Sequence, residues 1–293
     1  MEVLTENAKL ELQITACKVR MGIIEGTYNA KSGHPGGSLG LADTMTYLYM
    51  SHLNVDPKNP VDPKRDRLVL SKGHNAPALY AALAQKGFFD PDELKTLRKV
   101  GSRLQGHPVM GVVPGVDFST GSLGQGISAA CGMALAGKLD NESYRVYAIL
   151  GDGEIQEGQV WEAAMFAAHY KLDNLIAIVD NNGLQIDGSV DEVMSLGAID
   201  EKFRAFGWNV ICIDGHDFEQ IAAAFNDAEK SKGKPCEGKP CVIIQKSVKG
   251  KGVTFMENKV SWHGVAPNKD QYVSAMAELK ARMAVLEKEK GGE

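Results

Sequence analysis

The residues best suited to chemistry lie in two polar tips, each following an apolar run. Gly151-Asp152-Gly153 comes directly after the run 144–150, and Asp180-Asn181-Asn182 comes directly after the run 175–179. A carboxylate and an amide oxygen suit Mg²⁺ or Ca²⁺, which often complete their ligand shell with a bound diphosphate and water. The glycines beside Asp152 allow the backbone to approach such a ligand closely. The pattern predicts a metal and diphosphate site that contains Asp152 and Asn182.

The elements that must position these two side chains form a strand, helix, strand unit. The runs 144–150 and 175–179 are rich in β-branched and aromatic residues and predict strands, whereas the segment 161–170 favours a helix. In a right-handed βαβ unit both strands point their carboxyl ends at the same edge of the sheet. Asp152 and Asn182 are therefore expected to meet there.

The same alternation of strands and helices continues along the whole chain, without a linker-like change of composition or an internal repeat. We expect one doubly wound α/β domain over residues 1–293, with a mostly parallel sheet flanked by helices. Further strands are predicted over 67–70, 208–214 and 241–245. Further helices are predicted over 5–30, 41–52, 76–86, 91–100, 127–139, 218–231 and 271–290, the last of these on the surface.

Composition sets the outer limits of function. The 293 residues are 44% hydrophobic and 24% charged, as in ordinary globular proteins, and can bury a sizeable core. The formal net charge of −5 argues against a general nucleic-acid binder. The sequence has no apolar stretch long enough to span a membrane, and its polar, acidic amino terminus does not resemble a signal peptide. A cytoplasmic protein without nucleic-acid or membrane partners is the expectation.

Two histidine motifs precede the central unit. In the run 32–40 several glycines and a proline predict that no helix passes through, with Ser38 as a cap for the helix over 41–52. His34 stands before a proline and is held extended, which suits a ligand-facing loop and, equally, a plain turn between helices. His74 lies between a strand end and a helix start, where it can meet a diphosphate, although a single histidine there is more often structural.

The run Gly151–Ala163, with the Asn pair that follows it, resembles the metal and cofactor motif of transketolases, which use thiamine diphosphate (ThDP). The resemblance covers about residues 10–265, and the motifs appear in the family's order. The other matching motifs are Ser-Gly-His-Pro-Gly-Gly at 32–37, Ser-Lys-Gly-His at 71–74, Gly-His-Pro at 106–108, Thr-Gly-Ser-Leu-Gly-Gln-Gly at 120–126, Lys-Gly-Lys-Gly at 249–252 and Trp-His-Gly at 262–264. Many members have proline where this chain has Ser122.

The resemblance implies a role for each matching residue. It implies a ThDP cofactor with Mg²⁺, for which Ca²⁺ or Mn²⁺ can substitute, and sugar phosphates as substrates. In the family's pattern the metal ligands are Asp152, Asn182 and the carbonyl of Leu184, and the cofactor contacts are His74, Gly121, Leu123, Gly153 and His263, with Asp152 and Asn182 also on the cofactor. The substrate-facing histidines are His34, His107 and His263, and Glu157 communicates with the activating group across a subunit interface.

The resemblance also implies a partner. In transketolases a glutamate from a pyrimidine-binding domain of the other subunit activates the cofactor, and this chain ends where that domain would begin. We therefore expect the N-terminal subunit of a split transketolase, with two copies each of this chain and of a C-terminal subunit. It would transfer a two-carbon ketol unit from a ketose phosphate to an aldose phosphate.

Three alternatives remain open at this point. The chain could serve another ThDP enzyme, such as 1-deoxyxylulose-5-phosphate synthase or a 2-oxoacid dehydrogenase, but the segment 151–163 fits transketolase better. It could be a non-catalytic ThDP-binding or regulatory subunit. It could also be a fragment of a longer transketolase. These alternatives differ in the chains that accompany the protein and in whether ketol transfer occurs.

Two further groups of residues have less specific patterns. Lys246, Lys249 and Lys251 could attract sugar phosphates, but each is more simply read as part of a solvated patch. Cys236 and Cys241 could pair or bind a metal, but ordinary reduced loop thiols are the expectation, because the five cysteines are odd in number and form no Cys-x-x-Cys.

Overall fold

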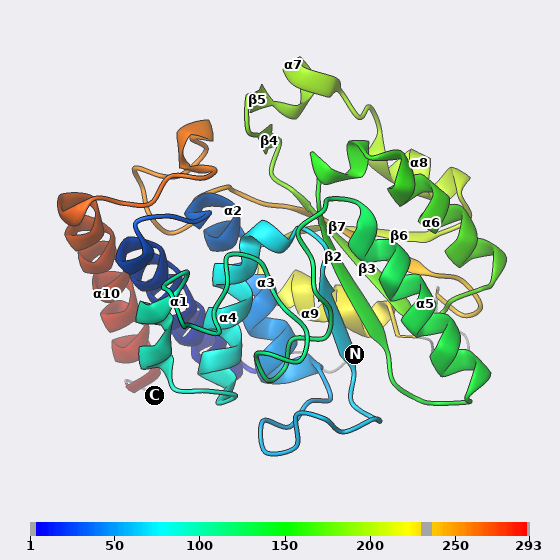
Figure 1. Ribbon diagram of the computed structural model, residues 1–293, viewed down its shortest axis with the longest axis horizontal. Helices are drawn as coiled ribbons and strands as arrows, with labels where there is room; N and C mark the ends of the chain where they lie inside the picture. Colours follow the sequence, from blue (N-terminus) through cyan, green and yellow to red (C-terminus); the bar gives the residue numbers. More distant parts are fainter. Residues whose placement is uncertain (1–3, 230–235, 292–293) are drawn as a thin grey trace.

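The computed structural model describes residues 4–229 and 236–291. At its centre is a sheet of five parallel strands in the order β1-β2-β3-β7-β6 (Figure 1). The strands are β1 (Arg67–Leu70), β2 (Val146–Gly151), β3 (Leu175–Asn181), β6 (Asn209–Asp214) and β7 (Cys241–Lys246). All five correspond to predicted strands, and the predicted parallel α/β sheet is confirmed.

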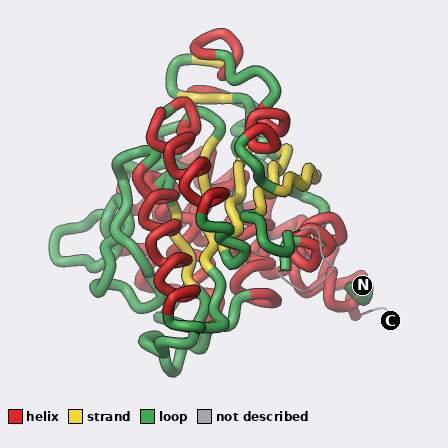
Figure 2. The backbone as a smooth tube through the Cα atoms, turned by 90° about the vertical axis from the view of Figure 1, so that its right-hand side faces the viewer, coloured by secondary structure: helices red, strands yellow, loops and turns green. Residues whose placement is uncertain are grey.

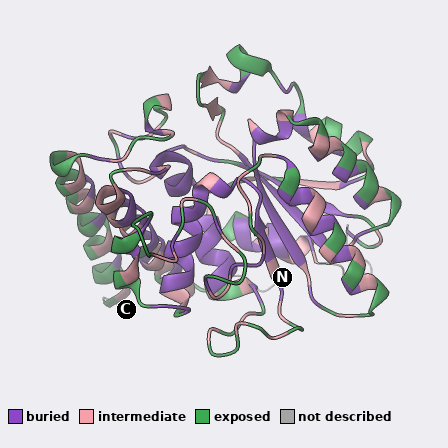
Figure 3. Ribbon diagram, viewed as in Figure 1, coloured by how far each residue is buried: buried purple, intermediate pink, exposed green. Residues whose placement is uncertain are grey.

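Both faces of the sheet are buried, because successive side chains along each strand enter different cores. Tyr147 and Ile149 of β2 belong to one core, whereas Ala148 and Leu150 belong to the other. Figure 3 shows β2, β3 and β7 as buried along most of their length, whereas the edge strand β6 is intermediate to exposed. The helices α1 (Glu6–Ala30), α3 (Ala42–Tyr47), α4 (Ala76–Lys86) and α9 (Phe218–Asp227) cover the first face, and α5 (Gln125–Leu139), α6 (Gly158–His169) and α8 (Ile199–Ala205) cover the second.

The amino- and carboxyl-terminal helices lie side by side at one end of the molecule (Figure 1). Thr5 caps α1 by accepting a hydrogen bond from the amide of Ala8. The helix α10 (Lys269–Gly291) packs on α1 through a narrow stripe that includes Leu279, while most of its other side chains are exposed. Its predicted surface location is confirmed.

The prediction that no helix passes through 32–40 is wrong. Pro35–Gly40 forms a short helix, α2, with the proline in its first turn, where the missing N–H costs nothing. Ser38 does not cap the next helix, because its hydroxyl donates to the carbonyl of His34 at 2.7 Å. Gly36, Gly37 and Gly40 leave no room for a Cβ against neighbouring residues, so close packing stabilises a sequence with poor helix propensity.

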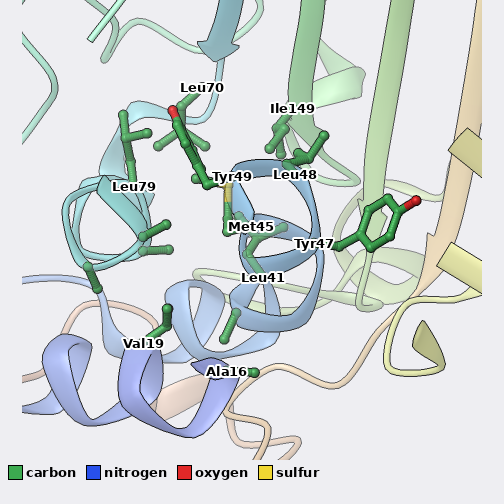
Figure 4. Close-up of a cluster of buried hydrophobic side chains, with 14 of the residues drawn as sticks. Ala16, Val19, Leu41, Met45, Tyr47, Leu48, Tyr49, Leu70, Leu79 and Ile149 are labelled. Carbon is green, nitrogen blue, oxygen red and sulfur yellow. The ribbon is translucent and has the colours of Figure 1, made fainter. Parts of the chain in front are cut away.

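Three other helix predictions are corrected in type or extent. The segment after α2 forms α3 and then a π-helical turn, Leu48–His52, whose Tyr49 is buried with Met45 in the larger core (Figure 4). The predicted helix over 91–100 is only a 3₁₀ helix, Pro91–Thr96, because the chain turns at Leu97. The helix predicted over 218–231 ends at Asp227, and its last two predicted positions, 230 and 231, lie outside the described residues.

A small excursion leaves the carboxyl edge of the sheet after β3. It consists of the hairpin strands β4 (Leu184–Gln185) and β5 (Gly188–Ser189) and the short helix α7 (Val190–Met194). Figures 1 and 2 both show this excursion projecting beyond the ends of the sheet strands. Ile186 and Met194 are 65% and 62% exposed, so apolar side chains at this edge lack a cover within the described part of the chain.

Two cysteines lie in the core. Cys236 and Cys241 are free but buried, and the side-chain amide of Asn209 donates to both sulfurs at 3.2 and 3.6 Å. They are therefore core thiols, which corrects the prediction of ordinary loop thiols.

Among the described residues, no helix is long and apolar enough to cross a membrane.

Candidate active site

A cavity of about 340 Å³ lies at the carboxyl edge of the sheet. It is lined by residues from the ends of β1, β2, β3 and β7 and from the excursion after β3. This is the position at which doubly wound α/β proteins bind ligands. All of the site residues predicted from the sequence line the cavity except His107.

The floor of the cavity is built where β2 and β3 end. Gly151 pairs with Asp180 across the two strands, so Asp152 stands one position beyond the sheet. Its carboxylate accepts hydrogen bonds from the amides of Gly153 at 2.8 Å and Gly183 at 2.5 Å. The second of these bonds reaches the segment beside Asn182, which confirms that the two predicted tips converge.

Burial and the carboxylate of Asp180 raise the pKa of Asp152 to about 6. The backbone N–H bonds from Gly153 and Gly183 favour the charged form but do not outweigh this cost. A buried carboxylate in this position gains from a nearby cation, so the electrostatics of the floor favour a metal ion beside Asp152.

The oxygen atoms around Asp152 fit a hard metal ion. Asn182 turns its side-chain oxygen to the amide of Leu184 at 3.1 Å, and the Leu184 carbonyl accepts from Lys249 at 3.3 Å. Each of these oxygens has further lone pairs, so a carboxylate, an amide and a carbonyl are available. No group of three or more His, Cys, Asp or Glu side chains able to hold a metal occurs in the described residues, which suits an ion that takes its other oxygens from a ligand.

Asp180 and Lys72 form a buried ion pair beneath this floor. Asp180 is fully buried and accepts from the Lys72 ammonium, the Ser247 hydroxyl and the Asn182 amide. Burial alone would raise its pKa, but Lys72 and these hydrogen bonds outweigh burial and lower it. The sequence around residue 72 contains no sign of this pairing, because Lys72 and Asp180 are separated by 108 positions.

The carboxylate of Glu154 contacts three loops of the site. The sequence motifs do not identify this residue as a ligand or as a structural residue. Its buried carboxylate accepts from the hydroxyl of Ser71, from the amide of Gly124 at 2.9 Å and from the amide of Gly151 at 3.0 Å. These donors follow β1, precede α5 and end β2. The carboxylate therefore fixes the relative positions of three cavity walls.

Three histidines form another part of the cavity lining, which we call the histidine wall. The ring centroids of His34, His74 and His263 are 5.1 to 5.4 Å apart. Burial lowers the pKa of all three, to about 4 for His34, about 2 for His74 and about 3 for His263. Nearby cations add to this effect. The three rings are therefore neutral at physiological pH, and each offers one donor and one acceptor nitrogen.

Lys249 joins the histidine wall to the floor. Its ammonium contacts Nδ1 of His263 at 2.9 Å and the carbonyl of Leu184 at 3.3 Å, and the residue is only 3% exposed. Burial and the charge of Lys72 lower its pKa to about 8. The solvated-patch prediction is wrong for Lys249, because it overlooked this burial, whereas Lys246 is exposed as expected.

His107 lies just outside the cavity lining. Its ring packs against Gly121, where an added Cβ would approach the ring to 3.3 Å. Arg98 links this region to the loop of His34, because its guanidinium donates to the Ser32 hydroxyl at 2.5 Å and lies against Gly106. Burial and the charge of Arg98 lower the pKa of His107.

Several features of the cavity fit a diphosphate cofactor. Gly73 approaches Thr120 so closely that an added Cβ would lie 2.6 Å from its hydroxyl oxygen, and a Cβ at Gly153 would lie 3.2 Å from Gln185 of the excursion after β3. Buried polar atoms without a partner among the described residues include the Nδ1 of His34, the Oδ1 of Asn75 and the hydroxyl oxygen of Thr120. Glu157 is exposed at the mouth, against the amino end of α5.

Several known proteins are similar to this chain in sequence and in fold. Residues 13–284 match the family model described as "Transketolase, thiamine diphosphate binding domain". The 6-deoxy-6-sulfo-D-fructose transketolase subunit of Clostridium sp. (strain MSTE9) is 45% identical over 93% of this chain and 97% of its own length. An apulose-4-phosphate transketolase subunit of Phocaeicola vulgatus is 43% identical over 96% of this chain and 98% of its own length.

Single-chain transketolases match over part of their length. The human enzyme is 45% identical over 86% of this chain, which corresponds to 39% of the human protein. The crystal structure of transketolase from Campylobacter jejuni superimposes with a TM-score of 0.85 at 35% identity, over 94% of this chain and 45% of the other. This chain therefore spans less than half of the single-chain enzymes. The chain belongs to the transketolase family, within which it corresponds to the thiamine-diphosphate-binding domain.

Proposed function

We propose that this chain is the ThDP-binding, N-terminal subunit of a transketolase built from two kinds of polypeptide. The complex would transfer a two-carbon ketol unit from a ketose phosphate to an aldose phosphate. One observation carries the proposal: an acidic, oxygen-lined floor and a group of neutral histidines line the same cavity at the carboxyl edge of the sheet. The whole chain's similarity to two transketolase subunits supports it.

The floor would hold the metal and the cofactor's diphosphate. We assign Asp152, Asn182 and the Leu184 carbonyl to Mg²⁺, and His74 and Gly153 to the diphosphate, with Gly121 and Leu123 lying against the rest of the cofactor. Lys249 donates to the Leu184 carbonyl, so a metal at this oxygen would lie close to the ammonium, and the repulsion between the two cations requires an anion nearby. The anionic diphosphate offers one.

Thiamine diphosphate, when bound, supplies a carbon centre that can store the negative charge of the transferred unit. The histidine wall would handle the protons of the sugar. Because a Lys249 ammonium donates to Nδ1 of His263, the proton of that ring lies on Nε2, which can donate to a substrate oxygen. His34 and His107 are assigned to the same task, since neutral imidazoles can both accept and donate a proton.

A second polypeptide would complete the site. Glu157 is exposed at the cavity mouth, and α5, α6 and the residue after α6 carry large exposed apolar side chains, because Leu139, Met165 and Tyr170 are 72%, 59% and 46% exposed. We propose that a C-terminal subunit covers this surface and brings the activating glutamate that the family requires. Two copies of each chain would give the heterotetramer expected from symmetric assemblies of this kind.

The proposal extends to the location of the enzyme and to its substrates. We propose a cytoplasmic enzyme that acts on sugar phosphates such as those of the pentose phosphate pathway. The two similar subunits are named for 6-deoxy-6-sulfo-D-fructose and apulose-4-phosphate, so substrate choice differs among such subunits. The histidine wall and the partner's residues would together select the sugar.

The test is the native mass of the protein isolated from its own cells, with identification of every chain that remains bound. We expect a second chain of similar size in a one-to-one ratio and ketol transfer by the complex with ThDP and Mg²⁺. A chain that purifies alone would contradict the two-polypeptide enzyme. A complex that binds ThDP but transfers no ketol unit would instead identify a regulatory subunit.

A further inference from the structure

Two buried charged residues and one histidine form a largely buried cluster that does not line the active-site cavity. Arg20 of α1 donates to both oxygens of Asp43 of α3, at 2.9 and 2.6 Å, and Asp43 also contacts Nδ1 of His216 at 2.8 Å. We call these residues the buried triad. Their side chains are only 8%, 7% and 13% exposed. A buried ionic cluster of this kind seldom adds net stability to the fold, which suggests that it has another role.

The buried triad makes two bonds to one loop, residues 247–252, which we call the Lys249 loop. The amide of Val248 donates to Nε2 of His216 at 2.8 Å. The Nε of Arg20 donates to the carbonyl of Lys251 at 3.0 Å. These two bonds hold the loop on either side of Lys249, the lysine that connects the histidine wall to the floor of the site.

The chemistry of these bonds fixes the protonation of His216. A backbone N–H can only donate, so Nε2 of His216 must accept from Val248 and carries no proton. The proton of the neutral ring therefore lies on Nδ1 and is donated to Asp43. Asp43 and Arg20 thus orient the imidazole so that its free lone pair points at the Lys249 loop.

The sequence of the loop suits this attachment. Gly250 and Gly252 have φ angles of +86° and +89°, which side chains other than glycine seldom adopt. A Cβ at Gly252 would lie 2.9 Å from Cδ of Arg20. The Lys-Gly-Lys-Gly pattern therefore places a lysine in the site between two backbone positions that close against Met256 and the buried triad.

We propose that Arg20, Asp43 and His216 are positioning residues that hold the Lys249 loop in its ligand-binding geometry. They act through Val248 and Lys251 and touch neither cofactor nor substrate. The expected effect on ThDP binding rests on the proposed function. The effect of the buried triad on the Lys249 loop does not, because it can be measured in the chain without cofactor. It gives a purpose to the Gly-His-Asp segment after β6, which the proposed chemistry does not use.

Two substitutions of His216 distinguish its hydrogen bond with Asp43 from its hydrogen bond with Val248. His216→Asn keeps a donor near the Nδ1 position but removes the acceptor for Val248. His216→Gln places an amide oxygen near the Nε2 position and can restore that acceptor. Asp117→Asn is the matched control, because Asp117 also forms a buried ion pair, with Arg65, but supports β1 and not the Lys249 loop.

The first measurement is hydrogen exchange of the amides of residues 247–252 in the full chain without cofactor. Loss of one hydrogen bond should speed exchange of this segment by roughly ten-fold in His216→Asn, while His216→Gln and Asp117→Asn stay near the parent after correction for global stability. Exchange of the segment in His216→Asn at the parent rate would overturn the proposal, whatever the chain binds.

The second measurement is the dissociation constant for ThDP in the presence of Mg²⁺, measured on the same full-length variants. We expect roughly ten-fold weaker binding in His216→Asn, with recovery in His216→Gln. Equal weakening in His216→Asn and Asp117→Asn would show a merely structural role and overturn the proposal. Failure of the parent to bind ThDP would count against the proposed function, while the exchange result would still decide the bracing.

Arg20→Lys provides a second route if His216→Asn does not fold. A lysine can keep the ion pair with Asp43 but has a CH₂ group in place of the Nε–H that Arg20 donates to the Lys251 carbonyl. Faster exchange of the Lys249 loop with near-parent thermal stability would support the positioning role. Unchanged exchange in a folded Arg20→Lys chain would contradict it.

Discussion

The two sides of the cavity satisfy their polar groups in different ways. On the floor, Asp152, Asp180 and Lys72 each have partners within the chain. On the histidine wall, the three rings lie 5.1 to 5.4 Å apart, and Nδ1 of His34 is buried without a partner among the described residues. The floor is arranged by the fold itself, whereas the wall retains hydrogen-bonding capacity for a ligand.

The difference follows from the chemistry of the side chains. Buried aspartate and lysine side chains are costly unless they are paired, which explains why Asp180 and Lys72 pair with each other inside the chain. Histidine can lose its charge at little cost, because its usual pKa lies near neutrality. A wall of buried neutral histidines can therefore stay open to ligands without a large penalty.

The largest expected effect comes from breaking the floor. Lys72→Met leaves Asp180 buried without its cation and should lower the free energy of unfolding by about 3 to 5 kcal/mol. Chemical denaturation measures this change. The control is Arg204→Met, which breaks an exposed ion pair with Asp200 and should cause at most a slight loss. Similar losses in both variants would show that burial of the floor pair is unimportant.

The next effect concerns the ligand side of the floor. Asp152→Ala removes the carboxylate assigned to the metal and should weaken Mg²⁺-dependent ThDP binding on the order of 100-fold, more than loss of a supporting group usually does. Calorimetric titration of the full chain measures the affinity. Asp187→Ala is the control, since Asp187 also lines the cavity but is exposed on the excursion. Parent-like affinity in Asp152→Ala would remove the metal assignment.

The smallest effect concerns the histidine wall and its response to acid. The folded-state pKa of His74 is lowered by burial and Lys72 to about 2, so this ring stays neutral when folded but gains a proton when unfolded below about pH 6.5. Its contribution therefore lowers stability as the pH falls from about 6.5, by up to about 1.4 kcal/mol per pH unit, and has no effect above that range.

His74→Asn should accordingly make the loss of stability between about pH 6.5 and about pH 4.5 shallower by roughly 1 kcal/mol per pH unit. Urea unfolding at several pH values measures the slope. His169→Asn is the control, because it makes the same replacement at an exposed position at the end of α6. An identical slope in His74→Asn would show that His74 is not kept neutral by burial.

The sequence predicts the two ligand-binding tips of the floor better than the buried lysines of the site. Asp152 and Asn182 could be placed together because parallel strands end at one edge of a sheet, a rule that needs only local patterns. Lys249 and Lys72 could not be assigned, because burial of a lysine depends on partners far along the chain, such as Asp180 for Lys72. No periodicity in the sequence reports such a pairing.

The short helix α2 shows a second limit of sequence reasoning. Glycine and proline disfavour helices on average, yet Pro35 stands at the first turn and Gly37 packs against Asn75, where a side chain would not fit. Tertiary packing decides the local structure here. His34, the residue before this helix, is placed in the cavity as a consequence.

The most direct test of the central claim is steady-state ketol transfer by this chain alone, by the C-terminal polypeptide alone and by a one-to-one mixture, each with ThDP and Mg²⁺. We expect turnover only in the mixture, because the floor and the histidine wall come from this chain and the activating glutamate comes from the other. Full turnover by this chain alone, or none in a mixture that forms a stable complex, would contradict it.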